Sequence, residues 1–167
     1  MRARPPTRSP DMLEHATLLL RPPDPSMVQA VADPATGASL GFARRRPPGL
    51  WERWLGGWVV EVYEQEDASL LCTIRRGWLR PQCRLVYDAD EQGVGVVRGR
   101  RLEDRRGRVI ALRWQDAAGK GDVYRDPAGR PLATVRPGRD GLAVAFTEEV
   151  TADPFAKMLV LAAALQG

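Results

Sequence analysis

The segment "ADPFAKMLVLAAALQG" (152–167) is apolar all round, and Lys157 is its only charged residue after Asp153. Asp is a common helix cap and Pro154 suits a first helical position, so these signals predict a helix over residues 154–166. At 1.5 Å per residue this helix is about 20 Å long, which is too short to cross a bilayer. A helix that is apolar on every side must be buried on every side.

Upstream of this helix, hairpin signals recur along the chain. Each has an apolar run, an acidic residue, a short polar stretch and a second apolar run. Asp starts such turns by accepting hydrogen bonds from the following backbone, and Gly supplies the positive φ that closes them. The clearest hairpins span residues 31–42, 86–97, 102–112 and 123–135, with a looser copy without Gly at 62–74.

Between the turns, residue types alternate as in strands that bury one face. Trp58, Val60 and Val62, for example, share a face opposite Glu61. The alternation predicts about eleven strands, at residues 16–20, 27–33, 38–44, 57–64, 69–76, 81–88, 94–101, 108–115, 121–125, 132–136 and 141–147. So many antiparallel strands must close or cover their edges.

A closed barrel with the helix threaded through its centre satisfies both needs. We therefore predict a mainly β protein, a single closed antiparallel β-barrel of about 11–12 strands around a buried hydrophobic C-terminal α-helix. The domain spans residues 13–167, and the Pro- and Arg-rich residues 1–12 are expected to be disordered. The competing interpretation is a tail inserted into a membrane.

Three features carry a resemblance to a known superfamily: the repeated V-Y-D-x-x-x-x-G hairpins, the unit "DVYRDPAGRPLATVR" (122–136) and the closing "TADPFAKMLVLAAAL" (151–165). Over about residues 13–166 the chain resembles Tubby C-terminal domains, phospholipid scramblases and LURP-one-related proteins, and it is most similar to compact LURP-one- or scramblase-like members. The resemblance implies a twelve-stranded antiparallel barrel around a hydrophobic C-terminal helix.

What the resemblance implies about function differs between branches. Tubby domains bind phosphoinositides through basic residues on the barrel, scramblases act at membranes and bind calcium near the last helix, and LURP-one-related proteins have no well-defined activity. This chain lacks a scramblase-type cysteine cluster, and only Glu148, Glu149 and Asp153 precede or cap its last helix. No basic pair aligns with the Tubby lipid site, so no residue is carried over.

Two short motifs resemble ligand loops but lack required parts. "DADEQG" (88–93) begins like a calcium loop, yet Gly99 stands where the twelfth-position Glu is needed. "GVGVVRG" (93–99) has Arg98 where a dinucleotide loop has its third Gly, and strand residues surround it. We interpret the first as an ordinary hairpin and the glycines of the second as sites of close backbone approach.

The two cysteines fall on adjacent predicted strands. Alternation places Cys72 inward, and it places Cys83, Leu85 and Tyr87 inward on the next strand, with Arg84 outward. This arrangement sets the cysteines across from each other. We interpret them as two buried, reduced thiols, with a redox pair as the alternative.

The usual parts of an active site are missing from the sequence. His15 is the only histidine and lies near the N-terminus, no serine has a nucleophile-type setting, and no carboxylate pair can be placed in a cleft. We predict that the protein is not an enzyme and uses no cofactor or metal.

The charge pattern offers the one functional lead. The net charge is +4, and all basic residues except Lys120 and Lys157 are arginines. Acidic residues are interleaved with them, which is typical of a solvated mixed-charge surface; the alternative is a basic face at one rim of the barrel. Arg105 and Arg106 form a further pair of this kind. The candidate binding residues are Arg44, Arg45, Arg46, Arg75, Arg76, Arg98, Arg100 and Arg101.

Arginine suits phosphate, and four tryptophans (residues 51, 54, 58 and 78) lie near two of these clusters, as at a membrane interface. We predict a non-catalytic module for anionic phospholipid headgroups, cytoplasmic and peripheral to the membrane, with no signal peptide or transmembrane segment. One alternative is a structural or protein–protein interaction domain without a small-molecule site. A second is nucleic-acid binding through the same arginines, which we rank below the others.

Overall fold

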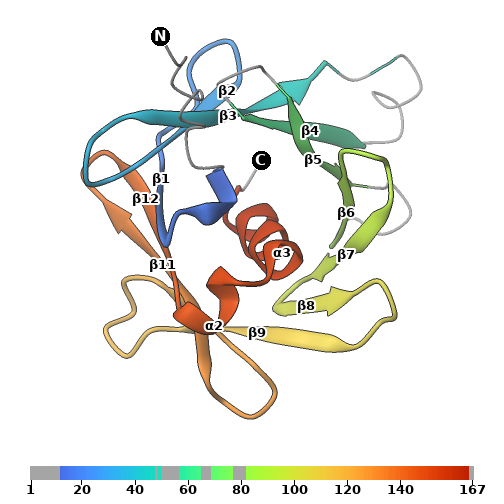
Figure 1. The fold of residues 1–167 in the computed structure, drawn as a ribbon, viewed down its shortest axis with the longest axis vertical. Coiled ribbons are helices and arrows are strands. Elements are labelled where there is room, and N and C mark those ends of the chain that lie inside the picture. Colours follow the sequence, from blue (N-terminus) through green and yellow to red (C-terminus); the bar gives the residue numbers. More distant parts are fainter. Residues whose placement is uncertain (1–11, 48, 50–56, 65–68, 77–81, 166–167) are drawn as a thin grey trace, which may run out of the picture.

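The computed structural model describes residues 12–47, 49, 57–64, 69–76 and 82–165. Its twelve strands form a closed antiparallel barrel around a C-terminal helix (Figure 1), so the predicted fold class is confirmed. Strand order follows the chain, and β1 pairs with β12 to close the wall. The strands are β1 (Thr17–Leu20), β2 (Val28–Ala32), β3 (Ser39–Arg46), β4 (Trp58–Glu64), β5 (Leu70–Arg76), β6 (Cys83–Asp88), β7 (Gly93–Arg98), β8 (Arg101–Asp104), β9 (Val109–Gln115), β10 (Asp122–Arg125), β11 (Pro131–Gly138) and β12 (Gly141–Phe146).

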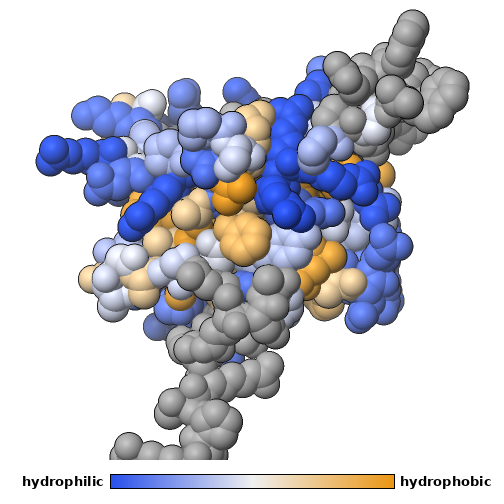
Figure 2. Space-filling model, turned by 90° about the horizontal axis from the view of Figure 1, so that it is seen from above, coloured by the Kyte–Doolittle hydropathy of each residue, from blue (hydrophilic) through white to orange (hydrophobic). Residues whose placement is uncertain are grey.

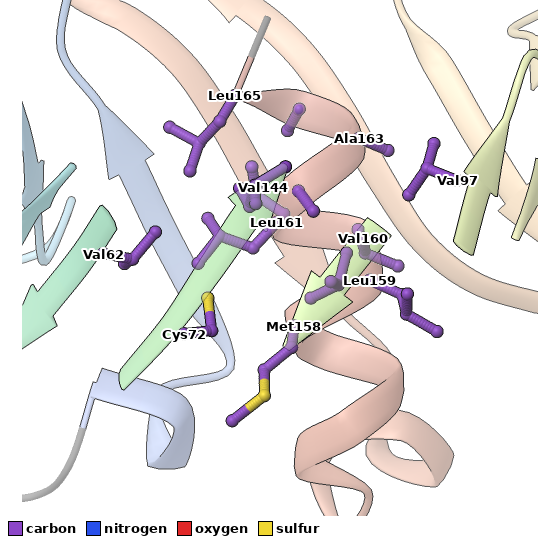
Figure 3. Close-up of a cluster of buried hydrophobic side chains, with 14 of the residues drawn as sticks. Val62, Cys72, Val97, Val144, Met158, Leu159, Val160, Leu161, Ala163 and Leu165 are labelled. Atoms are coloured by element: carbon purple, nitrogen blue, oxygen red, sulfur yellow. The ribbon is translucent and has the colours of Figure 1, made fainter. Parts of the chain in front are cut away.

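The central helix is α3 (Pro154–Ala164), and Asp153 caps it by accepting hydrogen bonds from the N–H groups of Phe155 and Ala156. All of its residues from Ala156 onward are buried, including Lys157. Figure 3 shows how its side chains meet those of the strands, among them Val62, Cys72, Val97 and Val144. The barrel therefore surrounds the apolar tail, as its composition requires.

Aspartates organise the turns through their side chains. Asp88 Oδ1 accepts hydrogen bonds from the N–H groups of Asp90 and Gln92, so "DADEQG" forms a hairpin as predicted. Asp104 Oδ1 does the same for Arg106 and Arg108. The aspartate turns at residues 24 and 116 follow the same pattern.

Glycine acts differently at different turns. Gly107 and Gly129 supply positive φ, +77° and +87°, as predicted for hairpins. In the 86–97 hairpin the positive φ falls on Glu91 instead. Gly95 is a site of close approach, because a Cβ there would collide with the Glu103 carbonyl oxygen and press on Leu159.

Several boundaries differ from the prediction. The strand expected over 94–101 divides at a turn into β7 and β8, which gives twelve strands rather than eleven. A one-turn helix, α2 (Glu148–Thr151), precedes α3. Met12, expected to be disordered, begins the 3-10 helix η1 (Met12–Glu14) and is 1% exposed. Residues 1–11, the loop within 62–74, most of the connector after β3 and the tryptophans at 51, 54 and 78 lie outside the described residues.

The inner face of β6 is the opposite of the predicted one. Leu85 is 39% exposed, whereas Val86 is buried and the side chain of Arg84 reaches inward to the helix. Cys72 faces inward as predicted, but its Cα partner is Asp88, and Cys83 pairs with Arg98. Cys83 is half-buried on the outer face, so the two cysteines are not across from each other.

The candidate site: an arginine-lined mouth of the barrel

The barrel has two different ends, which we name by the helix. The N-rim is the end at the N-terminus of α3 and holds the turns that follow β2, β6, β8 and β10. The C-rim is the end at Leu165 and holds the turns that follow β1, β7, β9 and β11, together with the end of β3 and the start of β6. Because the strands are antiparallel, a residue's position in its strand fixes its rim.

This topology brings the predicted candidate arginines to the C-rim ends of β3, β5, β7 and β8. The arginine pair considered with them, Arg105 and Arg106, lies in the β8–β9 turn at the N-rim instead. Figure 2 views the wall from the side of β2, β3 and β4, with strongly hydrophilic residues crowded toward one end and apolar residues lower on the wall. The rim is shared, but alternation divides these arginines between the outer and inner faces of the wall.

Three outward-facing arginines of the predicted set are paired with carboxylates. Arg44 lies 3.2 Å from Glu61, and Arg98 lies 3.7 Å from Glu103. Arg75 lies over the ring of Tyr87 and reaches Glu91 at 2.8 Å, so its charge points along the wall away from the C-rim. These pairs satisfy the charge of each arginine on the protein itself.

The Glu61 pair shows how such a contact is held. Burial alone raises the pKa of Glu61, but hydrogen bonds from Tyr63 and Arg44 outweigh this effect and leave the pKa below its usual value. Tyr63 donates its hydroxyl proton to Glu61 at 2.8 Å, and its ring stacks on Phe42. This outer patch is a self-contained structural cluster.

Four arginines instead face the inside of the mouth, and we call them the arginine mouth: Arg45, Arg76, Arg84 and Arg113. Arg45 and Arg76 belong to the predicted set. Arg84 was predicted to face outward, and Arg113 was not among the candidates. Their inward orientation follows from register, since Arg76 is the Cα partner of buried Trp58, and Arg113 is the Cα partner of Tyr124, which is 1% exposed.

The arginine mouth has few partners. Arg84 donates a hydrogen bond to the carbonyl oxygen of Ala162 at 3.1 Å, near the end of α3. Arg113 lies 3.9 Å from Asp122. The guanidinium groups of Arg45 and Arg84 both lie over the Trp58 ring, 5.7 and 5.8 Å from its centre. Among the carboxylates that the structure describes, Asp122 is the only one that forms an ion pair with this set.

Apolar surface lies beside the arginine mouth. A cavity of about 120 Å³ is lined by Pro23, Met27, Val60 and Leu165 together with Arg45. Met27 is 48% exposed and adopts φ +64°, an unusual conformation for a residue with a side chain. The C-rim therefore offers both cationic and apolar groups to a ligand.

At the N-rim the buried cation is bound by the protein itself. The Lys157 side chain lies inside the barrel and donates to the carbonyl oxygens of Leu13 and His15, the latter at 3.0 Å. Its Nζ also lies 5.0 Å from the centre of the Phe146 ring. Burial lowers the pKa of Lys157. Both η1 and α2 contact α3, and the His15 carbonyl accepts a hydrogen bond from Lys157, so His15 belongs to the closure of the barrel (Figure 1).

A cavity of about 410 Å³ lies at the N-rim between the β6–β7 and β8–β9 turns and α3. Its carboxylates, Asp88, Asp104 and Asp153, accept backbone hydrogen bonds within their own turns or cap the helix. In the described part of the chain, no group of three or more His, Cys, Asp or Glu side chains is placed to hold a metal ion. Nor does any helix there have the length and apolar content to span a membrane.

Comparison with known proteins bears on the fold alone. No protein-family model matches the chain, and no curated protein matches it. The X-ray structure of a protein from Arabidopsis thaliana superposes on it with a TM-score of 0.54 at 12% sequence identity. The match covers 88% of this chain and 90% of that chain. A barrel of this kind is thus similar to a fold already seen by crystallography.

Proposed function

We propose that the protein is a non-catalytic module that binds anionic phospholipid headgroups at the cytoplasmic surface of a membrane through its C-rim. The observation that carries the proposal is the division of the arginines: Arg44, Arg75 and Arg98 on the outer face are paired with glutamates, whereas the arginine mouth is short of carboxylates. Arginine presents a planar fork of donors that matches phosphate oxygens, and clustered cations near a membrane bind anionic lipid.

The resemblance to Tubby domains, scramblases and LURP-one-related proteins supports a membrane role, and we propose membership of that superfamily on the same basis. The apolar cavity beside Arg45 also suits a membrane contact, because Met27 and Pro23 at this rim are apolar neighbours of the cationic groups. Binding at the C-rim places the N-rim away from the lipid.

Vesicle co-sedimentation tests the proposal with variants matched in charge. Arg45/Arg76→Ala removes two arginines of the mouth at the C-rim, whereas Arg105/Arg106→Ala removes two arginines from the β8–β9 turn at the N-rim. We expect the protein to bind phosphatidylcholine vesicles only when phosphatidylserine or phosphatidic acid is included, and less at higher salt. The C-rim variant should lose several-fold in binding, and the N-rim variant should retain it.

Equal loss in both variants would show that net charge alone drives binding and would contradict the proposal. No binding to any vesicle would favour a protein-interaction domain. Binding to any duplex DNA with a steep dependence on salt would favour nucleic acid.

A further inference from the structure

Three arginines of the mouth, Arg76, Arg84 and Arg113, place like charges near one another. Arg76 and Arg84 are direct Cα partners on β5 and β6, a position where like charges destabilise a sheet. Burial lowers the pKa of Arg84, and the charges of Arg113 and Arg76 lower it further. Arginine nevertheless stays protonated in proteins, so this repulsion is present in the folded state.

The donors of these three side chains are largely unused. A guanidinium group has five N–H donors. Arg84 uses one on Ala162, and Arg113 interacts with the Tyr124 hydroxyl and, at 3.9 Å, with Asp122. Arg76 Nε is buried and has no hydrogen-bond partner. A buried donor without a partner costs free energy, which a bound acceptor would recover.

The surroundings hold the cluster in place. The Trp58 ring lies beside Arg84, and Arg45 lies over the same ring. Tyr124 is buried next to Arg113, and burial raises its pKa to about 12, so its phenol remains protonated. Fixed cations with spare donors suit a compact anion that accepts several hydrogen bonds at once.

We propose that Arg76, Arg84 and Arg113 form a binding site for a single phosphate group inside the C-rim. Three guanidinium groups with a single carboxylate partner, Asp122, leave an excess of positive charge that a phosphate neutralises. The site deepens the proposed function and rests on it only where the phosphate belongs to a lipid; a soluble phosphate ester presents the same chemistry.

Thermal unfolding in inorganic phosphate provides the test, against chloride at equal ionic strength. The decisive variant is Arg76→Gln, and its control is Arg75→Gln, the preceding residue on the opposite face of β5. At phosphate near ten times Kd, the wild type and Arg75→Gln should gain about 3–6 °C in Tm. Arg76→Gln should lose most of this gain. General stabilisation by phosphate as a salt acts on all variants alike.

Arg113→Gln is the second decisive variant, and it keeps the test valid if Arg76→Gln does not fold. Without phosphate, both inward variants should be at least as stable as the control at low salt, because each removes a repulsive charge. Equal gains in Tm for inward and control variants would overturn the proposal. So would a gain in chloride as large as that in phosphate.

Vesicles distinguish the source of the phosphate. Phosphatidylcholine vesicles with and without phosphatidic acid are compared for Arg76→Gln and Arg75→Gln. Loss of vesicle binding in Arg76→Gln alone supports the site with a lipid headgroup as ligand. If Arg76→Gln loses the gain in Tm from phosphate but still binds vesicles, the site is supported with a soluble phosphate as its ligand. That outcome would contradict lipid headgroup binding at this site. Loss of neither contradicts the site.

Discussion

The two ends of α3 treat buried positive charge in opposite ways. At the N-rim a single cation, Lys157, is fully buried and donates to two backbone carbonyls under η1. At the C-rim four arginines are partly buried and share one helix carbonyl and one carboxylate. The protein itself supplies the hydrogen-bond acceptors for Lys157. It supplies few acceptors for the arginine mouth, which is the pattern expected where a ligand completes the contacts.

The same contrast appears across the wall at the C-rim. Arg75 and Arg76 are consecutive, yet Arg75 pairs with Glu91 outside while Arg76 Nε has no hydrogen-bond partner inside. Both residues are arginines, and they are neighbours at the same end of β5. The face of the strand decides whether an arginine is structural or available.

Helix α3 forms the core of the barrel at both the N-rim and the C-rim. Leu161 is 0% exposed, and its truncation to Ala should lower the free energy of unfolding by about 2–5 kcal/mol through lost burial and a cavity. Phe155, on the same helix, is 53% exposed, and Phe155→Ala should cost less than about 1 kcal/mol. Urea unfolding measures both, and similar costs would show that the helix is not enclosed.

Replacing Lys157 tests whether this side chain anchors η1 at the N-rim. Lys157→Met leaves the Leu13 and His15 carbonyls without their donor. The free energy of opening η1 should therefore fall by about 1–3 kcal/mol, and its amide hydrogens should exchange faster. Exchange in the strands of the C-rim should change little. Unchanged protection of η1 would contradict the role of Lys157 as its anchor.

The pH dependence of the same variant follows from the lowered pKa of Lys157. Below its unfolded value of 10.5 the unfolded chain binds more protons at this site than the folded one, so this group makes stability rise with pH until both forms are neutral. Lys157→Met should lack that rise. Subtracting the pH dependence of the variant's stability from that of the wild type separates the contribution of Lys157 from those of other titrating groups.

The two cysteines give a smaller test, because they lie on opposite faces of the wall. Burial raises the pKa of Cys72 to about 12, so its folded state keeps a proton that the unfolded chain loses above pH 9. Stability should therefore fall with pH above 9 in the wild type and less so in Cys72→Ala. A thiol reagent should label Cys83 well before Cys72 in the native protein. Equal labelling rates would contradict the assigned faces.

Much of this fold could be predicted from local chemistry. The helix was predictable because an all-apolar segment needs burial on every side, and the hairpins because Asp organises the backbone that follows it. The turn that divides β7 from β8 was missed, because Arg98 to Arg101 contain no Asp and resemble a continuous strand. Helix α2 is a single turn, too short for a periodic signal.

The candidate site was only half predictable. Arg45 and Arg76 were among the candidates, but Arg84 was placed outside because alternation was assumed to put apolar residues inside. In β6 the inner face is the one that contacts α3, and at the mouth Arg84 donates a hydrogen bond to the Ala162 carbonyl. Which residues of β6 face inward therefore depends on α3, which is distant in sequence.

The most direct test of the central claim compares two triple variants of equal charge at the same rim. One replaces the inward Arg76, Arg84 and Arg113 with Gln, and the other replaces the outward Arg44, Arg75 and Arg98. Co-sedimentation with phosphatidic acid vesicles should be lost in the inward variant and largely kept in the outward one. Equal loss in both, or loss only in the outward variant, would contradict the assignment of the arginine mouth as the binding site.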